Sequence, residues 1–92
     1  MKEKRYVFEE YRDKWGAGSE KVFENKNAAV EFAKEEWESL TKKDKDSYQQ
    51  DPAGMFRVYE IEITPQELEA YEEGELDGVL DEYKTSGIWD AL

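Results

Sequence analysis

Two kinds of hydrophobic spacing alternate along this chain, and together they predict a small α+β domain. Residues 4–11 and 20–24 are rich in aromatic and β-branched residues, and a loop with two glycines separates them. This pattern favours an antiparallel β-hairpin. Residues 27–40 then repeat apolar positions every three or four residues, which predicts an amphipathic helix capped by Asn25 or Asn27. Its apolar face comprises Ala29, Val30, Ala33, Trp37 and Leu40.

The middle of the chain predicts a second helix and a third strand. Thr41 precedes Asp44 by three residues, which is the spacing of a capping box and indicates a short helix over residues 42–49. Residues 55–63 are the best strand in the sequence, because apolar residues alternate with Glu60 and Glu62. Its first apolar residues fall on the opposite face from the later ones, so we expect a bulge or a second contact near Arg57.

The C-terminal third predicts helices. Thr64, Pro65 and Glu67 form a strong helix start, and Gly74 is expected to end or bend that helix. Helical spacing then recurs over residues 76–84, as a second helix or as the continuation of one bent helix. The last eight residues end in apolar side chains that could dock on the domain.

These elements combine into one predicted architecture. We expect a three-stranded antiparallel sheet with a crossover helix, in the order β-β-α-α-β, followed by one or two acidic C-terminal helices. Residues 1–92 form a single domain in this interpretation, with residues 1–63 as scaffold and residues 64–92 as an acidic helical segment.

Composition excludes several kinds of chemistry. The chain has neither cysteine nor histidine, which removes disulfides, zinc–thiolate sites, thiol nucleophiles and the commonest general base. Paired carboxylates occur throughout and single out no catalytic pair. The segment that starts at Asp44 lacks the later ligands and turn glycine of a calcium loop. We therefore expect no enzyme activity, no cofactor and no metal, and the absence of a signal-like or membrane-spanning segment predicts a cytoplasmic protein.

Charge distribution is the most informative bulk property. The net charge is -11, but residues 1–50 carry 11 basic and 12 acidic residues, whereas residues 51–92 carry 2 basic and 12 acidic ones. This imbalance disfavours binding to nucleic acid or anionic membranes and favours a basic protein partner. The candidate partner surface comprises Glu67, Glu69, Glu72, Glu73, Glu75, Asp77, Asp81, Glu82 and Trp89. Trp15, in the glycine loop, is a further candidate interface aromatic.

Two resemblances can be traced in the chain. Residues 37–48, with Trp37, Leu40, Thr41, Asp44, Lys45 and Tyr48, resemble the helix-turn-helix junction of the high-mobility-group box. That family packs three helices and binds DNA through a basic surface, whereas this chain has strand-like residues before the junction and lacks basic flanks. We interpret the similarity as a shared corner, in which Tyr48 folds back onto Trp37. Residues 6–63 as a whole resemble short uncharacterised accessory proteins of bacteria and their phages or mobile elements.

Two functions remain open at this stage. The first is a non-enzymatic binding or regulatory module whose acidic C-terminal surface meets a basic protein, with a nucleic-acid mimic as its specific form. The alternative is a structural, homo-oligomeric domain in which the aromatic residues bury a self-interface and the charge serves only solubility.

Overall fold

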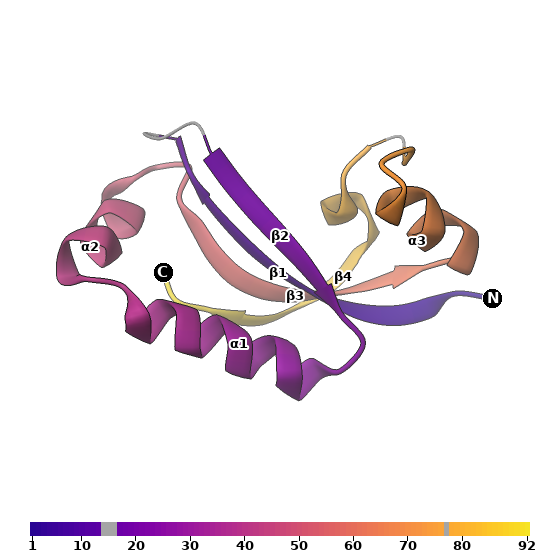
Figure 1. The fold of residues 1–92 in the computed structure, drawn as a ribbon, viewed down its shortest axis with the longest axis horizontal. Coiled ribbons are helices and arrows are strands. Elements are labelled where there is room, and N and C mark those ends of the chain that lie inside the picture. Colours follow the sequence, from indigo (N-terminus) through magenta and orange to yellow (C-terminus); the bar gives the residue numbers. More distant parts are fainter. Residues whose placement is uncertain (14–16, 77) are drawn as a thin grey trace.

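The computed structural model describes residues 1–13, 17–76 and 78–92 and places an antiparallel sheet at the centre of the molecule (Figure 1). The sheet has four strands in the order β2-β1-β3-β4. They are β1 (Glu3–Arg12), β2 (Ala17–Phe23), β3 (Met55–Ile63) and β4 (Lys84–Asp90). The helices are α1 (Lys26–Ser39), α2 (Lys42–Gln50), α3 (Pro65–Glu72) and the short 3-10 helix η2 (Leu80–Tyr83).

The prediction of a three-stranded sheet followed by acidic helices is wrong at the C-terminus. The last residues form a fourth strand against β3, and only η2 lies where a helix over residues 76–84 was expected. Gly74 and Gly78 adopt φ angles of 76° and 101°, which L-residues with a side chain rarely adopt, and they end the helical path. Val79 shows that the apparent helical spacing was coincidental, because its side chain is 60% exposed while Leu80 is fully buried.

Strand β3 is apolar on both faces, which explains without a bulge at Arg57 why its early and late apolar residues differ in phase. The register between β1 and β3 runs without a shift from Glu3 and Ile63 to Tyr11 and Met55. Regular alternation therefore sends the early and late apolar residues of β3 to opposite faces, and the bulge expected near Arg57 is absent from this ladder.

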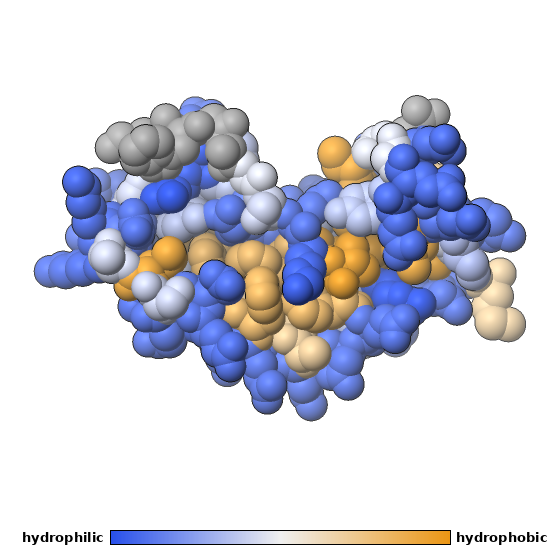
Figure 2. Space-filling view, viewed as in Figure 1, coloured by the Kyte–Doolittle hydropathy of each residue, from blue (hydrophilic) through white to orange (hydrophobic). Residues whose placement is uncertain are grey.

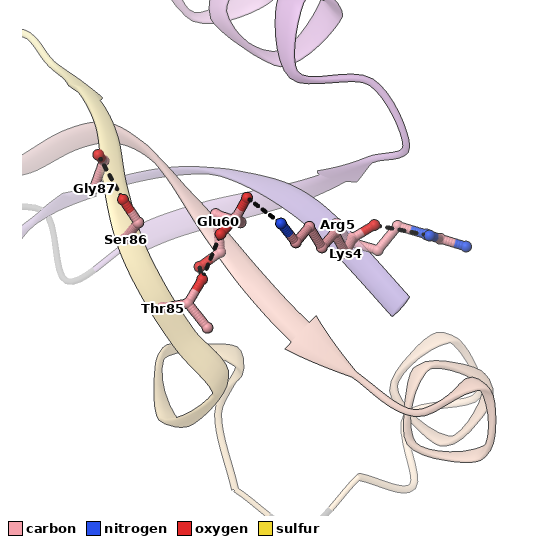
Figure 3. Close-up of polar contacts among 6 residues, drawn as sticks. All are labelled: Lys4, Arg5, Glu60, Thr85, Ser86 and Gly87. Atoms are coloured by element: carbon pink, nitrogen blue, oxygen red, sulfur yellow. Dashed lines mark hydrogen bonds and ion pairs between the residues drawn. The ribbon is translucent and has the colours of Figure 1, made fainter. Parts of the chain in front are cut away.

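The irregularities of the sheet lie in β4 instead. The β3–β4 register shifts twice, so that Ile88 and Thr85 of β4 each stand between paired positions. At the second shift, the Thr85 hydroxyl donates to the Glu60 carboxylate over 2.7 Å (Figure 3). Glu60 also lies 4.0 Å from the ammonium group of Lys4, so a single carboxylate links three strands.

Two hydrophobic clusters occupy opposite faces of the sheet. Under α1, Phe56 contacts the rings of Phe8, Trp37 and Tyr48 at centroid distances of 5.1, 5.0 and 5.3 Å. The other face buries Val7, Tyr59, Ile61, Ile63 and Leu80. Figure 1 shows α1 beneath the sheet, with α3 and η2 on the other side of it near the opposite end.

The starts of α1 and α2 and the corner between these helices are built as the sequence predicts. The Asn25 side chain accepts a hydrogen bond from the Ala28 amide at 3.1 Å, and the Thr41 hydroxyl accepts one from the Asp44 amide at 3.2 Å. Tyr48 then packs against Trp37 with a centroid distance of 6.1 Å. These contacts close the α1 cluster at its end nearest α2.

Gly54 marks a close approach of two backbone segments between α2 and β3. A Cβ atom at this position would clash with the Tyr48 carbonyl oxygen, whereas one at Gly87 would meet nothing within 4 Å. We expect Gly54→Ala to lower the free energy of unfolding by about 1–3 kcal/mol, because a backbone segment must shift. Gly87→Ala is the matched control and should be close to neutral. Urea unfolding followed by circular dichroism measures both, and equal midpoints for the two variants would contradict the prediction.

Candidate functional site

The start of α3 is held by a capping box. The Thr64 hydroxyl accepts a hydrogen bond from the Glu67 amide at 3.2 Å, and the Glu67 carboxylate accepts one from the Thr64 amide at 3.2 Å. Pro65 occupies the first turn, where its missing N–H costs nothing. These residues direct α3 away from the end of β3, as the sequence predicts.

Glu67 also ties α3 to η2, so it belongs to the scaffold of this region. The Tyr83 hydroxyl donates to the second carboxylate oxygen of Glu67 at 2.7 Å. This hydrogen bond, together with those from Thr64, lowers the pKa of Glu67 below its ordinary value. The same bond raises the pKa of Tyr83.

The remaining acidic residues of this region point outward. We call them the acidic lobe: Glu69, Glu72, Glu73, Glu75 and Glu82. All five are exposed, and none forms an ion pair with another residue in the described part of the chain. Figure 2 shows hydrophilic residues covering α3. The lobe is therefore a surface of negative charges that have no compensating ion pair within the described ranges.

Three other predicted site residues are placed differently. Asp81 lies 3.2 Å from Arg57, so its charge is compensated. Trp89 of β4 pairs with Val58 of β3, and its side chain packs on the α1 cluster. The sheet therefore lies between the Trp89 ring and α3. Asp77, and Trp15 of the glycine loop, lie outside the described residues.

A polar cluster around Arg57 was missed by the sequence analysis. The Arg57 guanidinium donates to Glu9 at 2.8 and 2.9 Å and to Asp81 at 3.2 Å, which joins β1, β3 and η2. Its carbon centre lies 5.1 Å from the centroid of the Tyr59 ring. Burial alone would lower the pKa of Arg57, but the hydrogen bond to Glu9 and the two carboxylate charges raise it. The sequence feature that could have indicated this cluster is that Arg57 is the only basic residue within the third strand.

Tyrosines line the same face of the sheet. Tyr59 is fully buried, and its hydroxyl is the one buried side-chain polar atom among the described residues that has no hydrogen-bond partner. Burial, followed by nearby carboxylates, raises its pKa. Burial, followed by the charge of Glu20 on β2, raises the pKa of Tyr71 of α3 to about 12. A hollow of about 270 Å³ borders Arg57, Tyr59 and Lys84.

Comparisons with family models, with curated proteins and with solved structures found no match. Within the described ranges, no group of three or more acidic side chains is arranged to hold a metal ion. No described helix is both long and apolar enough to cross a membrane. Functional inference for this protein therefore starts from its surfaces, of which the acidic lobe is the most distinctive.

The lowered pKa of Glu67 predicts that the stability of the protein depends on pH. Because the folded-state pKa is lowered, ionised Glu67 stabilises the protein above its unfolded-state pKa of about 4.3, and this contribution is lost as pH falls through the folded-state value. Glu67→Gln should therefore have a lower Tm than the wild type near neutral pH. The difference should shrink steadily as the pH falls below about 4.

Thermal unfolding at several pH values measures this difference. Glu69→Gln is the matched control, since the same helix carries it and no described residue pairs with its carboxylate. A gap between Glu67→Gln and wild type that stays constant with pH would show that the charge of Glu67 does not stabilise α3.

Proposed function

We propose that this protein is a non-enzymatic binding module that captures a basic protein on its acidic lobe. The observation that carries the proposal is the contrast between two sets of carboxylates. Glu9 and Glu60 of the sheet form ion pairs, whereas the five carboxylates of the lobe form none with a described residue. Natural surfaces usually intersperse both signs of charge, so such a set carries a repulsive cost.

A basic partner would convert that cost into affinity and faster association. The lobe is suited to this because Glu67 ties α3 to η2 and the buried Leu80 packs η2 on the sheet, so little conformational freedom is lost on binding. Proteins that bind nucleic acid are one class of such partners, because they present lysine and arginine to phosphates that carboxylates can imitate. We expect the encounter in the cytoplasm.

Two quadruple variants of equal charge test the proposal. The first changes Glu69, Glu72, Glu73 and Glu75 to glutamine. The matched control changes Glu24, Glu31, Glu35 and Glu38, which are equally exposed acids on and beside α1. Both variants bring the net charge from -11 to -7.

The measurement is capture of proteins from a host lysate by the immobilised full chain at low and high salt. The lobe variant should lose its basic partner, with affinity weakened about tenfold or more, because each exposed charge pair contributes about 0.2–1 kcal/mol. The control should retain it, and added salt should weaken the wild type. Equal capture by both variants would refute the lobe as the binding surface. Light scattering alongside would show whether the chain instead associates with itself.

A further inference from the structure

The two edges of the sheet differ in their readiness to accept another strand. At one edge, β4 is interrupted by the two register shifts at Thr85 and Ile88, and such bulges disrupt further pairing. At the other edge, β2 pairs with β1 without a shift from Phe23 to Ala17. Strand β2 therefore presents a regular row of backbone groups whose outer side pairs with no other strand in the described part of the chain.

An apolar groove runs beside this open edge. It has a volume of about 480 Å³ and lies between β2, α1 and α2. Its apolar lining comprises Phe8, Phe32, Leu40, Tyr48 and Phe56, and its polar lining comprises Glu10, Ser19, Glu20, Lys21 and Glu36. Figure 2 shows hydrophobic residues gathered on this face between β2 and α1. Phe32 and Leu40 are only half-buried, so part of the groove floor faces solvent.

The groove has a polar cover that can move. The Lys21 ammonium lies 4.7 Å from the centroid of the Phe32 ring and 5.3 Å from that of Phe23. Lys21 is exposed and forms no ion pair with another described residue, so its long side chain can swing aside at little cost.

The opposite face of β2 is acidic. Glu20 points to that face, next to its cross-strand neighbour Glu9. Because side chains alternate along a strand, a segment placed beside β2 would set every second side chain over the groove and the others near Glu20. One face of the edge therefore offers aromatic rings flanked by Glu10 and Glu36, and the other face offers Glu20.

We propose that the β2 edge binds an extended peptide segment of alternating apolar and basic residues, which joins the sheet as a fifth strand. Backbone hydrogen bonds to β2 supply affinity, the groove selects the apolar side chains, and Glu20 selects lysine or arginine on the other face. The groove of this site lies on the α1 face, away from the acidic lobe, whereas Glu20 lies on the face that carries α3.

A second copy of this chain fits the edge less well. When a two-fold axis relates two antiparallel β2 strands, each residue pairs with a residue on the same face of the sheet. The axis therefore passes between one residue and its own copy. An axis at Glu20 or Lys21, the centre of the exposed edge, sets like charges directly opposite each other. Each copy also brings a net charge of -11.

The probe is a set of eight-residue peptides with free ends blocked. Their odd positions carry valine, leucine or phenylalanine, and their even positions carry lysine. Comparison peptides carry glutamate at the even positions, or N-methyl groups at either the odd or the even positions. Fluorescence anisotropy with the full chain gives the affinities, and amide hydrogen exchange locates the binding.

We expect lysine peptides to bind at least about tenfold more tightly than glutamate peptides. One of the two N-methylated forms should lose binding by at least about tenfold, because only one edge of the peptide faces β2. Amides between Ser19 and Phe23 should become protected, whereas those of β4 should not. Glu20→Gln should weaken binding severalfold, and Glu75→Gln, a matched change in the acidic lobe, should not.

Several results would overturn the proposal. They are a failure of every lysine peptide to bind, equal binding by both N-methylated forms, protection outside β2, or concentration-dependent dimers that protect β2 without peptide. The lobe variants leave β2 unchanged, so loss of capture by the lobe and loss of peptide binding by the edge can be told apart.

Discussion

The architecture of this protein depends on one strand that is apolar on both sides but at different ends. In β3, Phe56 and Val58 face α1, whereas Tyr59, Ile61 and Ile63 face the opposite side. A single layer of helices could not bury both sets. The chain covers one end of one face with α1 and the other end of the other face with α3 and η2, and the sheet lies between two offset clusters.

This offset separates surfaces of different character. Aromatic rings fill the space under α1, and where that cover stops short of β2 the side chains of Phe32 and Leu40 are partly exposed. On the other side, α3 needs only a few inward residues, which leaves its outer side free to carry charge. The ion pairs of Arg57 lie on this second face, where they join β1 and β3 to η2.

Local signals in the sequence predicted local structure well. The caps at Asn25, Thr41 and Thr64 form as their spacing indicates, and β3 spans the expected residues. What failed was set by distant partners. Residues 84–90 include a glycine and several polar residues, and they become a strand only because β3 offers an edge. Val79 stands at a position that fits a helical repeat, although its side chain is exposed. The inward role of Glu67 and the partner of Asp81 likewise depend on Tyr83 and Arg57, whose positions no local pattern specifies.

The unequal edges of the sheet also limit how this protein can assemble. Addition of strands propagates only when each new member offers a fresh edge of the same kind, as in fibrils. Here the register shifts at Thr85 and Ile88 make β4 a poor template for pairing. A chain that accepts a strand at β2 is therefore poorly suited to pair with another molecule at β4. The sheet therefore offers one regular edge for the addition of a strand, at β2.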